Sequence, residues 1–188
     1  MKPQFHVPLI TYPDTSSLSL VQNAVDFARH QKADLTASIM QIGMPLAGQT
    51  SPWIDDIERL NSEAKRFSQD GYVALSEALY EYAREADIRA LIQTFEVSEP
   101  LVPARFTEIS RAYDLSIMEV SETTIPLVER LVFDSGRPLA LFPANHVCNR
   151  IDTVAIAWDG SAPLSAALTG ARLFLESASK IILISITE

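Results

Sequence analysis

The most constraining feature of this sequence is an internal repeat, in which the opening pattern of the chain returns near its end. Residues 10–40 (ITYPDTSSLSLVQNAVDFARHQKADLTASIM) have the pattern of a strand, an Asp/Ser turn, an amphipathic helix and a second strand. The same pattern returns over residues 154–187 (VAIAWDGSAPLSAALTGARLFLESASKIILISIT). Because an internal repeat sets the architecture before any single residue does, we expect one complete α/β unit followed by the opening of a second.

The bulk composition is that of an ordinary globular protein, and the net charge excludes some classes of binding partner. The sequence has 188 residues, of which 47% are hydrophobic and 21% charged, enough for one full domain and part of another. The formal net charge is −9, whereas binders of nucleic acid or anionic membranes need a basic face. We therefore expect neither nucleic acid nor membrane as a partner.

The cysteine content and the lack of long apolar runs bear on the cellular compartment. Cys148 is the only cysteine, so the sequence predicts no internal disulfide and no cysteine metal cluster. The N-terminal residues lack the apolar core of a signal peptide, and no stretch reaches the ~18 apolar residues of a spanning helix. These features favour a cytoplasmic location.

Strand-like and helix-like segments alternate along the first three quarters of the chain. Short apolar runs predict strands, and apolar residues at helical spacing after Ser or Pro predict helices. The strands are expected over residues 5–11, 34–42, 88–96, 114–120 and 139–142, and the helices over 17–31, 51–86, 103–112 and 123–133. Such alternation favours a parallel sheet with helices on both faces and right-handed crossovers.

Local signals refine two of these helices. Ser16 or Ser17 is expected to cap the first helix. The helix of residues 51–86 is expected to begin at Ser51-Pro52 and to bend or break at Gly71. Aromatic residues at helical spacing along it indicate a core or interface stripe. These residues are Trp53, Phe67, Tyr72 and Tyr82.

In both copies of the repeat, an Asp and small polar residues stand where the strand passes into the helix. Asp14 is followed by Thr15-Ser16-Ser17, and Asp159 is followed by Gly160-Ser161. Open parallel sheets bind ligands at the carboxyl ends of their strands, whereas Asp and Ser also cap helices. The sequence leaves a ligand contact and a structural cap open for both aspartates.

The remaining reactive side chains show no pattern typical of catalysis or metal binding. The histidines lack ligand spacing, none is placed to form a triad with a serine, and the neighbouring carboxylates suit helix capping and solvation. These side chains are His6, His30, His146, Cys148, Ser161, Asp55, Asp56, Glu119 and Glu122. We therefore expect no catalytic residue and no metal ligand.

Three segments, taken in order, resemble the universal stress protein family. VAIAWDGSAPLSAAL (154–168) is similar to the family's opening strand and turn, AYDLSIMEV (112–120) to its fourth strand, and VERLVFDSGRPLALFP (128–143) to its last helix and fifth strand. The resemblance implies an α/β fold with an open five-stranded parallel sheet of the adenine nucleotide alpha hydrolase-like type, helices on both faces, and a partial second β-α-β repeat. The chain is similar to tandem members of the family, which have two such domains in one polypeptide.

The resemblance also implies a division of the chain and a candidate site. Residues 1–143 would be a universal-stress-protein-like domain, 144–150 a linker, and 151–188 the first β-α-β of a second domain. Asp14, Asp159, Gly160 and Ser161 would form the adenine and ribose end of a nucleotide site. The apolar run IILISI at residues 181–186 is expected to be covered by another copy of the chain.

The sequence departs from the family after the predicted fourth strand. Nucleotide-binding members carry a Gly-x-x-Gly and a later Gly-Ser there, because backbone N–H groups wrap a phosphate only where no Cβ blocks the approach. Here a shorter loop without glycine, Glu119-Val120-Ser121-Glu122-Thr123-Thr124, takes this position. Since its glutamates would repel a triphosphate, we expect no ATP or other cofactor in the first domain.

These expectations favour a non-enzymatic stress-response or regulatory protein that acts as a homodimer and through contacts with an unidentified protein. The alternative is an ATP-binding protein or weak ATPase whose site lies in the second domain or between chains. A flavodoxin-like or receiver-like domain is a third option. The predicted third strand ends in Glu96 and lacks the phospho-acceptor Asp of a receiver, which counts against that variant.

Overall fold

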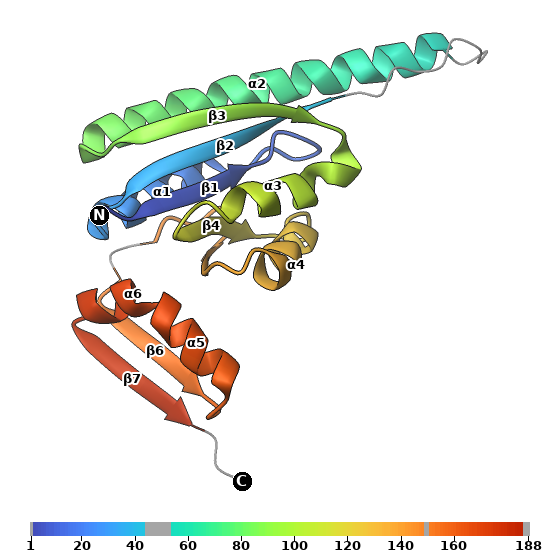
Figure 1. The fold of residues 1–188 in the computed structure, drawn as a ribbon. Helices are drawn as coiled ribbons and strands as arrows, with labels where there is room; N and C mark the ends of the chain where they lie inside the picture. The colour runs from blue at the N-terminus through green and yellow to red at the C-terminus, as the bar shows by residue number, and fades with distance from the viewer. Residues whose placement is uncertain (1, 44–53, 149–150, 186–188) are drawn as a thin grey trace.

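A computed structural model describes residues 2–43, 54–148 and 151–185 (Figure 1). The strands are β1 (Gln4–Leu9), β2 (Asp34–Ile42), β3 (Ala90–Val97), β4 (Leu115–Val120), β5 (Leu139–Pro143), β6 (Thr153–Trp158) and β7 (Lys180–Ser185). The helices are α1 (Leu18–His30), α2 (Ile54–Ala86), α3 (Val102–Ser110), α4 (Ile125–Asp134), α5 (Ala162–Gly170) and α6 (Arg172–Ser177). A 3-10 turn at Glu99–Leu101 leads into α3. The elements alternate as the sequence predicts.

Five strands form one parallel sheet in the order β3-β2-β1-β4-β5. β1 pairs with β2 along its whole length and with β4 at Phe5 and His6. The chain winds outward from β1 to β3 on one side and then returns to β4 and β5 on the other, so the direction of winding reverses between β1 and β4. The prediction of an open five-stranded parallel sheet is confirmed.

Helices cover both faces of this sheet, and each face has its own apolar cluster. One cluster packs under α1 and α2, and the other packs under α3 and α4. Successive residues of a strand alternate between them: Ile39 and Ile117 belong to the first cluster, Met40 and Met118 to the second. Because both faces are buried, the strands read in sequence as nearly continuous apolar runs.

The first helix begins at a serine, as predicted. Ser17 is the N-cap of α1, and its Oγ accepts the backbone N–H of Leu20 at 3.1 Å. The Ser16 hydroxyl has a different role, since it accepts the backbone N–H of Ile10 at 2.9 Å. Of the two candidates, Ser17 therefore caps the helix and Ser16 closes the loop that precedes it.

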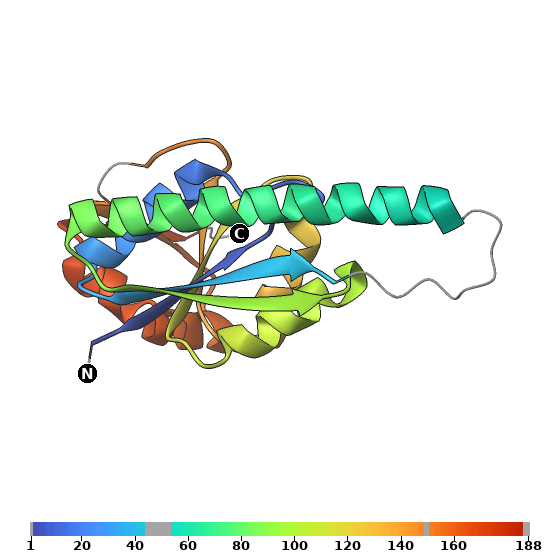
Figure 2. The same cartoon turned by 90° about the horizontal axis from the view of Figure 1, so that it is seen from above.

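α2 is one helix of 33 residues, and its N-terminal end projects beyond β2 and β3 (Figure 2). It passes through Gly71 without a break, contrary to the sequence prediction. A Cβ at Gly71 would lie 2.8 Å from Thr15 Oγ1, so glycine serves there to let α2 cross close to the β1–α1 loop. The predicted start at Ser51-Pro52, and Trp53, lie outside the described residues.

The aromatic residues of α2 divide between core and surface. Tyr72 and Tyr82 pack at the border of the cluster under α1 and α2. Phe67 is 48% exposed and meets Tyr12 edge-on, with ring centroids 6.4 Å apart. The stripe therefore belongs to the core in its C-terminal part and reaches the surface where α2 leaves the sheet.

His6 is a fully buried residue of β1 in the middle of the sheet. Its Nδ1 lies 3.0 Å from Ser110 Oγ, its Nε2 lies 2.9 Å from Ser38 Oγ, and its ring stacks on Tyr113. Burial lowers the pKa of His6 to about 3, because loss of solvation disfavours the imidazolium. His6 is therefore a neutral core side chain that connects β1 to β2 and α3.

Residues 153–185 form a β-α-β unit with its own two-stranded parallel sheet. β6 pairs with β7 from Thr153 and Lys180 to Trp158 and Ser185. The sequence predicted one helix between these strands, but α5 ends at Gly170 and α6 begins two residues later. A Cβ at Gly170 would lie 2.9 Å from Pro138 Cγ. The glycine that ends α5 therefore also permits a close approach to the first domain.

α1 carries the contacts that hold the C-terminal segments against the first domain. Asn23 is buried, donates from Nδ2 to the His146 carbonyl at 2.7 Å, and accepts the Cys148 N–H at 2.8 Å. Further along α1, Phe27 stacks on Phe174 of α6 with ring centroids 5.2 Å apart. The described part of the predicted linker is thus fixed on α1 by hydrogen bonds.

Candidate functional site

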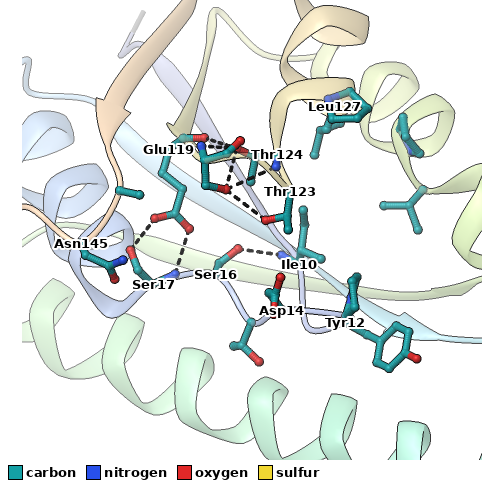
Figure 3. A pocket seen from close by; sticks show the side chains of 17 residues that line it. Ile10, Tyr12, Asp14, Ser16, Ser17, Glu119, Thr123, Thr124, Leu127 and Asn145 are labelled. Atoms are coloured by element: carbon teal, nitrogen blue, oxygen red, sulfur yellow. Dashed lines mark hydrogen bonds between the residues drawn. The ribbon is translucent and has the colours of Figure 1, made fainter.

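A pocket opens at the carboxyl ends of β1 and β4, between the β1–α1 loop and the start of α4 (Figure 3). The winding of the sheet reverses here, and open α/β sheets bind ligands in the crevice formed at such a reversal. The cavity volume is about 290 Å³, near the lower limit of small-molecule sites, which is roughly 300 Å³. The fold therefore provides a small cavity at the position expected for a ligand.

The pocket wall combines apolar side chains, hydroxyl groups and two carboxylates. The lining residues are Ile10, Tyr12, Pro13, Asp14, Thr15, Ser16, Ser17, Val102, Pro103, Glu119, Ser121, Thr123, Thr124, Pro126, Leu127, Ala144 and Asn145. These described lining residues include no Lys, Arg or His. The formal charge of the wall is therefore negative, from Asp14 and Glu119 alone.

Glu119, near the end of β4, turns its carboxylate toward the N-terminus of α1 (Figure 3). Oε1 accepts the backbone N–H of Ser17 at 2.9 Å, and Oε2 accepts the Ser17 hydroxyl at 2.5 Å. Glu119 is only 5% exposed. A negative charge beside the first turn of a helix is stabilised by unpaired N–H groups and by the helix dipole. Glu119 therefore places a carboxylate where the N-terminus of α1 stabilises an anion.

The loop after β4 uses its own polar groups for internal hydrogen bonds. Thr124 Oγ1 accepts the Ser121 N–H at 2.8 Å and donates to the Glu119 carbonyl at 2.8 Å. The backbone N–H groups of Thr124 and Ile125 donate to the Ser121 carbonyl at 3.1 and 3.2 Å. Pro126, at the start of α4, has no N–H. Few donors therefore remain at this helix N-terminus for a phosphate.

Asp14 lies at the mouth of the pocket, in the loop between β1 and α1, and is exposed. The loop is closed by Ser16, whose N–H donates to the Ile10 carbonyl at 2.9 Å. Since Ser17 caps α1, the helix cap and the loop closure do not require the Asp14 carboxylate. The arrangement therefore keeps a ligand contact open for Asp14.

Asp159, Gly160 and Ser161 form a turn and a helix cap in the second unit. Asp159 Oδ1 accepts the Ser161 N–H at 2.8 Å, and this bond is the largest cause that lowers the pKa of the Asp159 carboxyl. Gly160 adopts φ +75°, and Ser161 Oγ caps α5 by accepting the Leu164 N–H at 3.2 Å. All three residues have a local structural role, and none of them lines the pocket that contains Asp14.

The other candidate side chains lie in separate parts of the fold. Glu122 is exposed and is not part of the pocket wall, so it does not form a carboxylate pair with Glu119 there. His30 ends α1, whereas Cys148 is a half-buried free thiol after β5. No three His, Cys, Asp or Glu residues among those described are grouped so that they could hold a metal ion.

Sequence reasoning identified Glu119 but not its partner. Glu119 and Ser17 are 102 positions apart, and no spacing rule connects a residue at the end of a strand with the cap of a distant helix. The usable signal is indirect: both residues end or follow strands that a parallel sheet would place side by side.

No family model and no curated protein matches the sequence. Among solved structures, a universal stress protein from Archaeoglobus fulgidus DSM 4304 matches with a TM-score of 0.66 and 18% identity. The match covers 97% of this chain and 66% of that protein. The chain has a universal-stress-protein-like fold. A member of that family from Burkholderia pseudomallei matches with a TM-score of 0.50 and 17% identity, over 74% of this chain and 96% of that one.

The universal-stress-protein-like chain spans about two thirds of the length of the Archaeoglobus protein. The likeness concerns the fold, in which the pocket beside β1 and β4 occupies the reversal point of the sheet. In the parts of the chain that the structure describes, no helix combines the length and the apolar character needed to cross a membrane.

Proposed function

We propose that this chain is a non-enzymatic regulatory protein of the universal-stress-protein type, which acts in the cytoplasm as a homodimer and through contacts with other proteins. The observation that carries the proposal is the uncovered second unit. Among its described side chains, none is buried. A two-stranded piece of this size buries too little apolar surface to be stable without a partner.

The second unit presents a large apolar surface to solvent. Leu183 is 61% exposed and Ile184 is 52% exposed. The exposed large apolar residues of the unit are Trp158, Ile181, Ile182, Leu183 and Ile184. Large exposed apolar patches mark interaction sites, and open strand edges offer unpaired backbone groups to another chain. The surface therefore suits a protein partner.

A second copy of the chain is the occupant that we propose for this surface. β1 is flanked by two strands, β2 and β4, whereas β6 has only β7 beside it in the described sheet. A two-fold axis would bring the same patch of two copies together. Lys180 is the only charged residue of β6 and β7, so little like-charge repulsion opposes such pairing.

The proposal also holds that the first domain does not bind ATP. Three features support this part: the carboxylate of Glu119 beside α1, the internally bonded loop after β4, and the small cavity volume. A triphosphate in this pocket would meet negative charge and few hydrogen-bond donors.

Adenine-nucleotide binding at a site in the second domain, or completed between chains, is the second candidate function. The observation that favours it is the turn before α5, where Gly160 has a positive φ and Ser161 caps the helix. Such a turn at a helix N-terminus suits an anion. The two candidates differ in whether a nucleotide accompanies the dimer.

Light scattering of the full chain over a concentration series tests the dimer. We expect a dimer, and we expect Leu183→Glu to convert it to monomer because a charge would be buried at the contact. Phe133→Glu is the matched control, since Phe133 is 82% exposed on α4 of the first domain. A monomeric wild-type chain would contradict the proposal, as would a dimer that Phe133→Glu breaks and Leu183→Glu leaves intact.

A further inference from the structure

We infer that the pocket between β1 and β4 binds a small, non-anionic organic molecule through a hydroxyl or amino group that donates a hydrogen bond to Glu119. This inference concerns the first domain and goes beyond the proposed assembly. It rests on the remaining acceptor capacity of Glu119, on the charge of the wall, and on the apolar part of the wall.

The Glu119 carboxylate has acceptor positions that the protein leaves unfilled. An ionised carboxylate offers about four lone-pair sites, and Ser17 fills two of them through its N–H and its hydroxyl. Glu119 is 5% exposed and lines the cavity. Because a buried charge is costly unless it is hydrogen-bonded, a donor group brought by a ligand would be favoured at this point.

The charge of the wall selects against anions. Asp14 and Glu119 are the charged residues among the described lining residues, and both are acidic. A concave surface of one sign concentrates its field on the ligand, and the net charge of the chain, −9, has the same sign. A carboxylate or phosphate would therefore be repelled, whereas an alcohol or an ammonium group would not.

The rest of the wall accommodates an apolar body. Ile10, Val102 and Leu127 contribute aliphatic surface from the loop after β1, from α3 and from α4. Small-molecule sites are typically apolar with a few convergent polar groups. The expected ligand is thus a compact ring or chain that carries at least one hydroxyl or amino group.

A matched set of probes tests this inference by amide NMR of the full chain. Benzyl alcohol, benzylamine, benzoate and phenyl phosphate share a ring and differ in the polar group. We expect the alcohol and the amine, at millimolar concentration, to shift the amide resonances of Ser17, Ser121 and Thr124. The benzoate and the phosphate should bind about tenfold more weakly, because like charges repel across the pocket.

Two substitutions that each remove one negative charge identify the residue that discriminates against anionic ligands. Glu119→Gln keeps an acceptor for Ser17 and removes the charge, so it should reduce the discrimination against benzoate and phenyl phosphate. Glu122→Gln removes one charge from the same loop outside the pocket wall and should leave the discrimination unchanged. Asp14→Asn, at the exposed mouth, should act in the same direction as Glu119→Gln and covers the case in which that variant does not fold.

Each other result overturns the inference. It is wrong if the anions bind as well as the alcohol, if no probe shifts these amides, or if Glu122→Gln acts as strongly as Glu119→Gln. The proposed dimer is tested by molecular mass, and the proposed ligand pocket is tested by chemical shifts. Failure of one proposal therefore does not contradict the other.

Discussion

At the scale of single residues, Glu119 and Ser17 connect segments that lie 102 positions apart in the sequence. The Ser17 hydroxyl accepts the Leu20 N–H and donates to Glu119. One serine therefore caps α1 and fixes the end of β4 against it. Both residues line the pocket, and Glu119 together with Asp14 gives its wall a negative charge.

Replacing Glu119 by Ala should lower the free energy of unfolding. Loss of hydrogen bonds to a charged group costs about 1.5–3 kcal/mol, and Glu119 makes two bonds while nearly buried. Urea unfolding of the full chain measures the change. Glu122→Ala, at an exposed position of the same loop, should stay within about 0.5 kcal/mol of wild type. Equal effects of the two substitutions would contradict the role given to Glu119.

His6 predicts a dependence of stability on pH. Its pKa is lowered by burial from the ordinary value of 6.5 to about 3, so the unfolded chain binds a proton that the folded chain does not. The contribution of neutral, buried His6 to the free energy of unfolding is fully present above pH 6.5 and is lost as the pH falls toward 3. Between pH 7 and pH 5 the loss should be about 2 kcal/mol.

The variant His6→Gln isolates this contribution. It should be less stable than wild type at pH 7, because the contacts with Ser38, Ser110 and Tyr113 change. Its stability should fall less steeply between pH 7 and pH 5. Urea midpoints at pH 7, 6 and 5 provide the comparison, and parallel curves for the two proteins would show that His6 does not titrate on unfolding.

At the scale of elements, α1 organises both the pocket and the C-terminal segments. Ser17, which caps α1, lies at the pocket. Further along the helix, Asn23 binds the segment after β5, and Phe27 stacks on Phe174 of α6. A disturbance of α1 would therefore reach the site and the second unit together.

Asn23→Ala should release the segment after β5. The substitution removes the bonds to the His146 carbonyl and the Cys148 N–H, which should cost about 1–3 kcal/mol. Cys148 is the only cysteine, so its rate of alkylation reports opening of this segment directly. The rate should rise in Asn23→Ala and stay unchanged in Asn61→Ala on α2. An unchanged rate in Asn23→Ala would show that the segment is held by other contacts.

The sequence predicted elements better than it predicted contacts. Apolar runs identified the strands, because both faces of the sheet are buried. The Ser16-Ser17 pair identified the start of α1, because caps follow local rules, and the structure assigns the cap to Ser17. Gly71 was misread as a bend, since its role is a close approach to Thr15, a residue distant in the sequence. Gly170 also approaches a residue distant in the sequence, Pro138. The sequence therefore did not predict that the helix between β6 and β7 divides into α5 and α6.

At the scale of the whole molecule, a well-packed first domain carries a second unit that has no buried side chain among those described. The stacking of Phe174 on Phe27 and a hydrogen bond from Gln31 Nε2 to Ser177 Oγ at 3.1 Å join this unit to α1 and its C-cap. An aromatic pair contributes only about 0.5–1.5 kcal/mol beyond its buried area. Large apolar side chains of β7 are therefore exposed among the described residues, and this is the surface that we propose a second copy of the chain covers.

Native mass spectrometry of the full chain, with and without ATP and Mg²⁺, tests both the proposed dimer and the proposed lack of nucleotide binding. We predict the mass of a dimer, unchanged by the nucleotide. A monomer at every concentration, or an added mass that equals an adenine nucleotide, would contradict it and would favour a nucleotide-binding protein.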